Sequence, residues 1–320
     1  MTDNRFFTDL SVSRRQLLAT SSLLPLAGAL GVSALPGAAR AQAAPAASAM
    51  PIARNLTLGE FEVATLLAGT RTSDDDPQEI FGMNVEPETF AQVSADNFIP
   101  DDRNQFFFTP TVVRAGGETI LFDTGLNAAG ITRALSEAGV AADEVDVVVL
   151  THMHGDHIGG LTGEDGAETF ANARYVTGQV EFDAWAKQEN EGFETKVRPL
   201  AEKMTFIGDG DSVVSGITAV AAFGHTPGHM AYHLESGGQR LMLIVDAANH
   251  YVWSLGYPDW EVKFDMDKQA AAATRRSLLD VLATDKVPFV GYHMPFPALG
   301  FVAPRGEGFE YVPASYQFML

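Results

Sequence analysis

The most distinctive stretch of the chain is "THMHGDHIGG", residues 151–160, which places three of the eight histidines of the sequence within six positions. Its core is an H-x-H-x-D-H pattern made of His152, His154, Asp156 and His157. Imidazole nitrogens and carboxylate oxygens are ligands that a borderline cation such as Zn²⁺ takes. The spacing lets the first two histidines converge on one ion while Asp156 and His157 turn toward a second. A loop of surface histidines is the alternative, and the density of the pattern makes it the weaker one.

Three later polar residues each end an apolar run and can complete such a site. His225 in "FGHTPGHM" provides a third nitrogen for the first ion, and His293 in "FVGYHMPFP" completes the second. Asp246 ends "LMLIVDA", and a buried carboxylate there must be paired or metal-bound, so it can bridge both ions. His229 is the alternative to His225, but it lies within the loop, where we expect it to form hydrogen bonds.

These residues predict a dinuclear hydrolytic site. Two divalent ions that share a hydroxide lower the pKa of the bound water, and that hydroxide can attack a carbonyl or phosphoryl centre without a side-chain nucleophile. We expect Asp246 and Asp156 to be the catalytic carboxylates and Zn²⁺ to be the cation. The expected ligands are His152, His154, Asp156, His157, His225, Asp246 and His293.

Aromatic residues in two segments are candidates for a substrate pocket. They are Phe106, Phe107, Phe108, Tyr251, Trp253 and Trp260. The pocket residues expected from this group are Phe107, Tyr251 and Trp253, together with His250. Aromatic residues at this spacing also occur in protein cores, so that alternative stays open. His250 either donates a proton to a leaving group or faces solvent.

The elements that position these residues follow from hydrophobic patterning. Helical patterns lie between apolar, strand-like runs, which indicates an α/β protein with packed sheets and outer helices. The expected strands cover residues 61–69, 106–116, 118–125, 144–152, 217–225, 230–236, 239–247 and 287–293. The expected helices cover residues 127–139, 178–188, 194–204 and 267–283. Asp123 also ends a strand-like run, and polar residues collect at such ends in α/β sites.

Composition excludes several functions. With 46% hydrophobic and 19% charged residues, the chain can bury a sizeable core. A formal charge of −20 repels polyanions, so we expect a small-molecule substrate and no nucleic acid. The absence of cysteine excludes disulfides, thiolate nucleophiles and thiolate metal sites. Oligomeric state cannot be read from the sequence, and a homodimer is compatible with it.

The N-terminus has the features of an export signal. Arg14 and Arg15 precede a mildly apolar stretch and a small-residue A-x-A site that ends at Ala41, a pattern typical of the twin-arginine (Tat) route. An uncleaved anchor helix is the alternative, but the stretch is weakly hydrophobic for that role. We therefore expect a signal peptide at 1–41, a flexible arm at 42–56 and a single catalytic domain at 57–320. The mature protein would be periplasmic or secreted and would not associate with the membrane.

The ordered set H-x-H-x-D-H, "HTPGH", a strand-end aspartate and a final strand-end histidine resembles the metallo-β-lactamase-fold hydrolases. The resemblance implies a four-layer αββα sandwich with a dinuclear site at one edge. It assigns one metal to His152, His154 and His225, the other to Asp156, His157 and His293, and both to Asp246. It also implies outer-shell roles for Asp123 and, within "HTPGH", His229.

Details within the superfamily bear on the substrate. The β-lactamases of the fold lack a carboxylate at the position of Asp246, and the nucleases normally need a basic face. "THMHGDHIGGL", "HTPGH" and "FPALGFVAPRGEGFEYVPASY" (296–316) resemble exported methyl parathion hydrolase-like enzymes. The expected function is hydrolysis of an ester, lactone or phosphotriester. The alternatives are an acyl-homoserine lactone lactonase and a metal-binding module without turnover.

Overall fold

The computed structural model describes residues 50–318. The expected signal peptide lies outside these residues, and so does most of the expected arm. The first strand begins at Ala53, inside the range expected to be a flexible arm, so the ordered domain begins earlier than predicted. None of the helices within the described residues combines the length and the hydrophobicity needed to cross a membrane.

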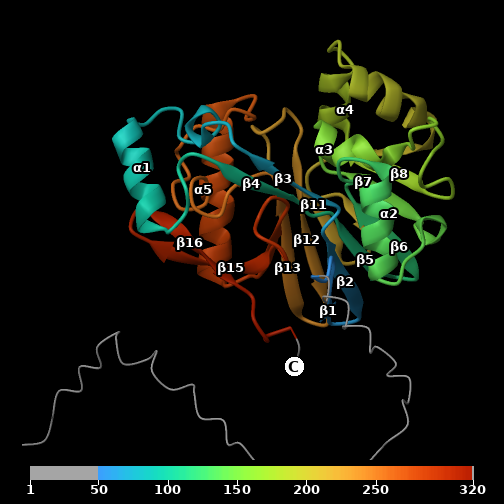
Figure 1. Cartoon of the computed structure of the whole chain (residues 1–320). Coiled ribbons are helices and arrows are strands. Elements are labelled where there is room, and N and C mark those ends of the chain that lie inside the picture. The colour runs from blue at the N-terminus through green and yellow to red at the C-terminus, as the bar shows by residue number, and fades with distance from the viewer. Residues whose placement is uncertain (1–49, 319–320) are drawn as a thin grey trace, which may run out of the picture. The chain divides into compact units, whose positions relative to one another are not determined.

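Two seven-stranded sheets form the centre of the domain (Figure 1). The first sheet, in spatial order, contains β1 (Ala53–Leu58), β2 (Phe61–Leu66), β5 (Thr111–Ala115), β6 (Glu118–Phe122), β7 (Val147–Leu150), β8 (Arg174–Gly178) and β9 (Met204–Ile207). The second contains β10 (Ser212–Val214), β11 (Ile217–Ala221), β12 (Met230–Ser236), β13 (Gln239–Val245), β14 (Phe289–Gly291), β15 (Leu299–Arg305) and β16 (Gly308–Pro313). A separate two-stranded antiparallel sheet pairs β3 (Gly69–Ser73) with β4 (Asn104–Phe108).

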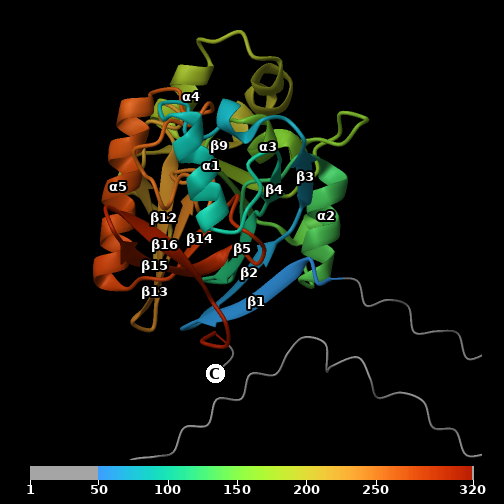
Figure 2. The same ribbon diagram turned by 60° about the vertical axis from the view of Figure 1, so that its left-hand side comes forward.

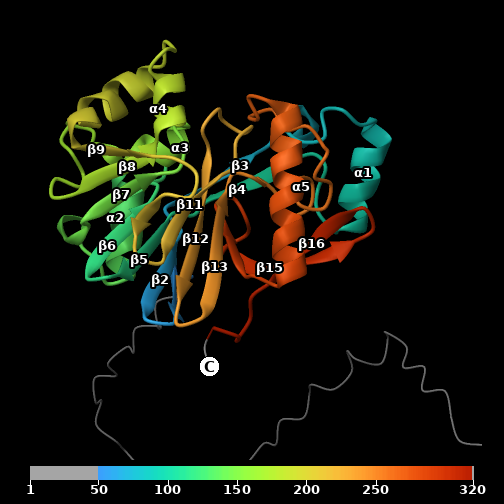
Figure 3. The same cartoon turned by 180° about the vertical axis from the view of Figure 1, so that it is seen from behind.

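Helices cover the outer faces of both sheets. The helices of the described chain are α1 (Pro87–Asp96), α2 (Ala128–Glu137), α3 (Gly155–Ile158), α4 (Gln179–Trp185) and α5 (Lys268–Asp285), with a π-helical turn at Phe193–Val197 and short 3₁₀ turns elsewhere. Figures 1 and 3 show α2 and α4 outside the first sheet and α5 outside the second. Turned by 60°, the molecule shows α5 and α2 on opposite sides of the sheets (Figure 2). The αββα sandwich expected from the sequence is confirmed.

The central strands are apolar throughout because both of their faces are buried. On β6 and β7, Ile120 and Val147 belong to the core between the sheets, whereas Leu121 and Val148 belong to the core beneath α2. Successive side chains of a strand point to opposite faces, so a continuous apolar run supplies both cores at once. The uninterrupted apolar sequence "VVVL" of β7 therefore indicates a strand in the centre of the sheet.

The run at 106–116 forms two strands and not the single strand predicted. The chain breaks at Thr109-Pro110, so that β4 pairs with β3 in the two-stranded sheet while β5 joins the first sheet. Proline cannot donate a ladder hydrogen bond, which accounts for the break. This break places the aromatic residues of β4 outside the main sheets.

Four of the candidate residues lie just beyond the ends of strands. β6 and β7 are parallel neighbours in the first sheet, as are β13 and β14 in the second. Asp123 directly follows β6 and Asp246 directly follows β13, while His152 and His293 each lie two residues beyond a strand. Since parallel strands end at the same sheet edge, the topology gathers these residues at one rim of the sandwich.

Candidate metal centre

One cluster of nitrogens comes from the loop after β7 and the turn between β11 and β12. His154 Nδ1 lies 3.2 Å from His152 Nε2 and 3.0 Å from His225 Nε2. The ligand atoms of these three histidines all lie within 4.8 Å of one another. Three converging imidazoles form a nitrogen set of the kind that binds Zn²⁺ and related cations.

A second cluster lies at the start of α3, beside the end of β14. Asp156 Oδ2 lies 3.7 Å from His157 Nε2 and 3.4 Å from His293 Nε2. The backbone N–H of His157 donates to His154 O, so the first turn of α3 begins between the two sets of ligands. The N-cap residue His154 thus belongs to the first cluster, and the helical residues Asp156 and His157 belong to the second.

Asp246 lies between the two clusters. Its Oδ2 is 3.2 Å from His225 Nε2 and 3.1 Å from His293 Nε2, and its Oδ1 is 3.4 Å from His157 Nε2. Asn249 donates to the same Oδ2 at 3.1 Å, which fixes the orientation of the carboxylate. The structure therefore brings together all seven residues that the sequence singled out as ligands.

The donor atoms of this centre fit divalent cations. His157 Nε2 and Asp246 Oδ1 are buried and have no hydrogen-bond partner, although buried polar atoms are nearly always paired. The two atoms lie 3.4 Å apart within the cluster of imidazole and carboxylate groups. A cation is the partner that satisfies an imidazole nitrogen and a carboxylate oxygen together.

The cluster holds carboxylates in a buried environment, which sets the pKa values of its histidines. Burial lowers the pKa of His154 to about 3 and lowers that of His152 as well. Burial opposes protonation of His225 too, but hydrogen bonds to Asp246 and Asp265 raise its pKa to about 9. For His157, the negative charges of nearby aspartates outweigh burial and raise the pKa well above its ordinary value.

Asp123 supports the second cluster from behind. Its Oδ2 lies 2.8 Å from His157 Nδ1, and its carboxylate also accepts the backbone N–H of Thr151 at 2.9 Å and the Thr151 hydroxyl at 2.8 Å. His157 Nδ1 must carry the proton in this contact, which leaves Nε2 free to bind a cation. Asp123 has φ 61°, a strained backbone conformation for a non-glycine residue.

His229 lies beside the cluster but outside its ligand sets. Its Nδ1 is 3.0 Å from the carbonyl of Ala222, and its Nε2 accepts the backbone N–H of Asp246 at 3.2 Å. Both ring nitrogens are therefore occupied, and His225 is the member of "HTPGH" that faces the cations. His229 orients the backbone that carries Asp246.

Three buried groups around the ligands were not predicted from the sequence. The Glu181 carboxylate on α4 accepts the N–H of Met153 at 3.0 Å and the N–H of Gly228 at 2.8 Å, and thereby joins the two ligand-bearing loops. Asp265 and Arg275 form an ion pair behind His225. Arg275 had a detectable signal, because it lies one helical turn before Leu278 and Leu279 on the apolar face of the predicted helix.

A cavity of about 430 Å³ opens onto both clusters. Besides ligand residues, Gly155 and Asn249, it is lined by Arg71, Phe106, Phe108, Leu126 and Phe264. The rings of Phe106 and Phe108 lie edge-on to the ring of His293, with centroid distances of 6.1 and 5.5 Å. The wall of the cavity is thus mainly apolar, and its floor consists of the candidate ligands.

The aromatic residues predicted to line the pocket lie elsewhere. Phe107 points away from the cavity because residues alternate along β4, and its carbonyl oxygen is 2.8 Å from His293 Nδ1. Trp253 is buried against Phe90 at 4.9 Å and donates its indole N–H to Ser94. Neither residue is among those lining the cavity, which corrects the prediction.

His250 and Tyr251 are also absent from the cavity lining. The ring of His250 stacks on Trp253 at 4.0 Å, and its Nδ1 accepts the backbone N–H groups of Val252 and Trp253. Tyr251 packs beside it, at 4.7 Å between ring centroids. These residues form a core behind the site, and for Tyr251 and Trp253 this core was the alternative interpretation of their spacing. His250 neither lines the cavity nor faces solvent, so both expectations for it were wrong.

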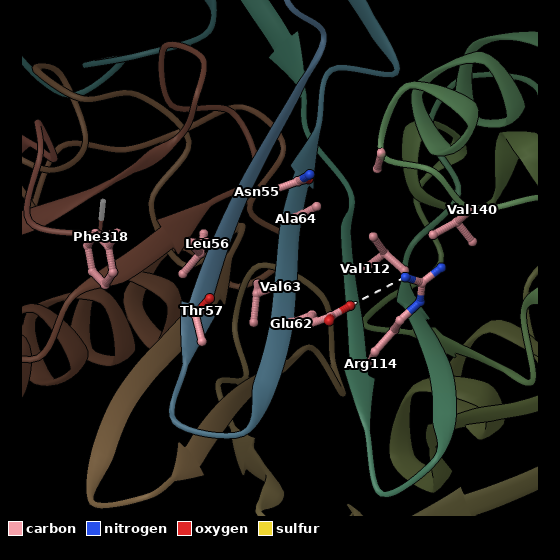
Figure 4. Close-up of a pocket in the computed structure, with 11 residues that line it drawn as sticks. Asn55, Leu56, Thr57, Glu62, Val63, Ala64, Val112, Arg114, Val140 and Phe318 are labelled. Atoms are coloured by element: carbon pink, nitrogen blue, oxygen red, sulfur yellow. Dashed lines mark hydrogen bonds and ion pairs between the residues drawn. The ribbon is translucent and has the colours of Figure 1, made fainter. Parts of the chain in front are cut away.

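Another hollow, of about 390 Å³, lies over β1, β2 and β5 (Figure 4). Its main charged groups are already paired, since Arg114 lies 3.3 Å from Glu62 and also donates to the carbonyl of Gly139. None of its lining residues belongs to the histidine and aspartate clusters. The cavity above the clusters is therefore the candidate site.

Solved structures share this arrangement of the fold. The chain aligns with AidC, described as a dizinc quorum-quenching lactonase in complex with the product N-hexanoyl-L-homoserine, at a TM-score of 0.76 and 26% identity, covering 83% of this chain and 99% of that one. The hydrolase AbOPH of the β-lactamase superfamily aligns at a TM-score of 0.76 and 21% identity, covering 83% and 98%. A Staphylococcus aureus protein described as a probable metal-dependent hydrolase aligns at a TM-score of 0.68 and 20% identity, covering 81% and 99%.

Two curated proteins match the chain over a short stretch. An anti-Pycsar protein, Apyc1 of Paenibacillus sp. (strain J14), is 40% identical over 57 residues, which cover 18% of this chain and 22% of that protein. Ribonuclease Z of Mycolicibacterium gilvum (strain PYR-GCK) is 41% identical over 63 residues, or 20% of each chain. The match spans about a fifth of the length of these relatives.

A family model covers the region that carries the ligands. The model of the metallo-β-lactamase superfamily matches residues 109–291, more than half of the 320 residues. The match begins just before β5 and ends with β14, so it includes the parallel pairs β6–β7 and β13–β14 and every candidate ligand except His293. The chain belongs to the metallo-β-lactamase superfamily.

Proposed function

We propose that the protein is a metal-dependent hydrolase that cleaves carboxylic ester bonds, with lactones as its preferred substrates. The observation that carries the proposal is the position of Asp246, whose carboxylate lies between two sets of imidazoles and leaves Oδ1 and the facing His157 Nε2 without partners. The similarity to a dizinc lactonase over 83% of the chain supports the choice of substrate class.

The ligands divide into two sets. His152, His154 and His225 would hold one ion, Asp156, His157 and His293 would hold the other, and Asp246 would contact both. Two divalent ions, Zn²⁺ in our proposal, polarise the scissile carbonyl and lower the pKa of water when bound. Other divalent cations that accept nitrogen and oxygen ligands would fit the same set.

The chain's own groups orient these ligands and handle the proton. Asp246 and Asp156 are the two carboxylates that line the cavity, and Asp156 is the more exposed of the pair. We assign to Asp246 the uptake of the proton that the attacking water loses, and to Asp156 the receipt of that proton from Asp246 and its delivery to the leaving oxygen. The acyl carbon to oxygen bond then breaks, and in a lactone both products remain one molecule.

The cavity wall indicates the kind of substrate. Phe106, Phe108, Leu126 and Phe264 supply apolar surface, which suits an acyl chain or another apolar substituent. Arg71 is the cationic side chain of the lining, and it can donate to an oxygen of the substrate away from the reacting carbonyl. The strong negative charge of the chain disfavours polyanionic substrates.

A phosphotriester is the second candidate, because the sequence of residues 296–316 resembles methyl parathion hydrolase-like enzymes. In the structure this segment forms β15 and β16 and the turns next to them, and none of its residues lines the cavity. Its resemblance therefore carries no information on which substrate the cavity accepts, and we place the lactone first.

Parallel assays with one enzyme preparation test the proposal. A γ-lactone with an N-acyl chain, a dialkyl aryl phosphotriester and an aryl acetate are compared at equal concentration, with metal content measured in the same sample. We expect two divalent ions per chain and the highest kcat/KM on the lactone. A higher kcat/KM on the phosphotriester would select the second candidate. A single ion and no turnover of any substrate would indicate a metal-binding module.

A further inference from the structure

The segment between Asp246 and Asp265 begins and ends at the metal centre. Asp246 lies between the two clusters, and Asp265 lies directly behind the ligand His225. The residues between them include the buried Trp253 and Trp260, and Phe264 at the cavity wall. Whatever fixes the two ends of this segment therefore also fixes the ligands and one side of the cavity.

Asp265 determines how His225 faces the cluster. Its Oδ1 lies 2.9 Å from His225 Nδ1, and both side chains are buried. With Asp265 as the acceptor, Nδ1 of His225 carries the proton, so that Nε2 of His225 presents its lone pair to the cluster.

Arg275 holds Asp265 from the other side. This arginine lies on α5 and is 1% exposed, which is rare for a charged side chain. Its Nη2 donates to Asp265 Oδ2 at 2.7 Å, its Nε donates to the carbonyl of Ala247 at 2.7 Å, and its Nη1 donates to the carbonyl of Pro258 at 2.9 Å. One guanidinium thus contacts the beginning, the middle and the end of the segment.

The backbone reinforces the same connection. The N–H of Met266 donates to the carbonyl of His225 at 2.9 Å, and the N–H of Asp267 donates to the carbonyl of Gly224 at 2.9 Å. Asp267 then caps the N-terminus of α5 through the N–H of Ala270. The helix that carries Arg275 is therefore attached directly to the loop that carries His225.

The energetic cost of the buried pair indicates a role beyond packing. Replacing a buried ion pair with well-packed apolar residues of similar volume is often neutral or stabilising. A helix that only had to cover the sheet could use an aliphatic residue at this position, as it does at Leu278, Leu279 and Leu282. The fork of the guanidinium, in contrast, is suited to fixing a carboxylate in one orientation.

We propose that Arg275 is a positioning residue for the three-histidine metal site, acting through Asp265 on His225. The inference rests on the proposed function, in which His225 is a metal ligand. In this proposal Arg275 contacts neither metal nor substrate, but it controls the metal affinity of the three-histidine site. The other site, formed by Asp156, His157 and His293, does not contact this pair and should respond less.

The test is metal binding by three variants compared with the wild type. Arg275→Met removes the guanidinium but keeps an apolar side chain of similar length, and Asp265→Asn removes the charge but keeps the shape. Arg276→Met is the matched control, because Arg276 is the next residue of α5 and binds Asp259 and the carbonyl of Glu307 at the surface. Co²⁺ is titrated into each metal-free protein and followed by visible absorption, and Zn²⁺ affinity is measured by competition with a chromophoric chelator.

We expect Arg275→Met and Asp265→Asn to bind one Co²⁺ with near wild-type affinity and the other about 10–100-fold more weakly, the range for loss of an outer-shell partner. Arg276→Met should match the wild type. If Arg275→Met does not fold by circular dichroism, Asp265→Asn and Arg275→Lys decide, and the lysine variant should recover part of the affinity. Folded variants that bind both ions as tightly as the wild type would overturn the inference. A wild type that does not bind two ions would instead contradict the proposed function.

Discussion

The Oδ2 atom of Asp246 lies 3.1 Å from Nε2 of His293, although 47 residues separate the two positions. β13 and β14 are parallel neighbours, with Val245 opposite Gly291, and α5 forms the crossover between them. Parallel strands bring their carboxyl ends to one edge, so a residue just beyond each strand meets the other. The contact thus follows from topology and gives the second site a nitrogen ligand that does not come from the H-x-H-x-D-H motif.

Replacement of His293 should therefore empty one site selectively. His293→Ala is expected to retain the ion held by His152, His154 and His225 and to lose the other. Turnover should fall by at least about 100-fold, because loss of a ligand exceeds the 10–100-fold effect of losing an outer-shell partner. Metal analysis by inductively coupled plasma mass spectrometry checks the stoichiometry. Two retained ions would contradict the assignment of His293.

Asp123 should affect metal affinity without binding metal. Asp123→Asn can no longer accept strongly from His157 Nδ1, so we expect the affinity for the second ion to fall by about 10–100-fold with the fold intact. Asp280, an exposed residue of α5, provides the matched control as Asp280→Asn. Chelator competition measures both variants. Equal affinities in the two would show that Asp123 has no role in orienting His157.

Arg71 should favour substrates that carry a second oxygen, away from the reacting carbonyl, to which its guanidinium can donate a hydrogen bond. On an N-acyl lactone, Arg71→Ala should lower kcat/KM by roughly 10–100-fold, corresponding to about 1.5–3 kcal/mol for a hydrogen bond from a charged donor. A γ-alkyl lactone of matched length, which lacks the amide oxygen, should be affected by less than about 3-fold, since there is no such bond to lose. Arg133→Ala, an exposed arginine of α2 outside the cavity, is the control. Equal losses on both lactones would exclude this recognition role.

The buried His250 should make the protein sensitive to acid. Burial lowers its pKa from 6.5 to about 3, so the unfolded chain binds a proton that the folded chain does not bind as the pH falls from about 6.5 toward about 3. Stability due to this residue is present above that window and declines within it by about 1.4 kcal/mol per pH unit. In His250→Asn the amide oxygen can accept in place of Nδ1 and does not titrate. Urea unfolding at pH 7 and pH 5.5 should show a smaller loss of stability in the variant. Equal losses would contradict the account.

The sequence was informative about the fold and the ligands for the same physical reason. Buried parallel strands are continuously apolar, and polar residues at their ends stand out, as Asp246 does after "LMLIV". Local density identified His152, His154, Asp156 and His157, because four potential ligands within six residues rarely serve packing alone. The proximity of Asp246 to His293 follows from strands that the structure shows to be parallel neighbours.

What the sequence did not reveal depends on side-chain direction and on long-range contacts. The phenylalanines of β4 alternate, so Phe106 and Phe108 face the cavity while Phe107 does not, and the break at Pro110 was needed to fix that register. Tyr251 and Trp253 belong to a separate aromatic core with α1. The sequence patterns did not predict this helix. The role of Glu181 requires two loops that only the folded chain brings together.

Asp246 is the residue on which the account depends most. Asp246→Asn keeps the shape of the side chain but removes the charge shared by the two sites. We expect turnover to fall by at least about 100-fold while the far-ultraviolet circular dichroism stays unchanged, because a bridging ligand contributes more than the outer-shell partners discussed above. His229→Ala is the comparison, since His229 contacts the backbone of Asp246 and not the cluster, and it should retain both ions.

The most direct measurement is anomalous X-ray diffraction at the zinc absorption edge from crystals of the metal-loaded protein. We predict two anomalous peaks about 3.5–4 Å apart, with one carboxylate oxygen of Asp246 in contact with each or shared between them. One peak should be bounded by His152, His154 and His225, and the other by Asp156, His157 and His293. A single peak, or a pair in which either ion lies out of reach of Asp246, would contradict the claim that this carboxylate bridges a dinuclear centre.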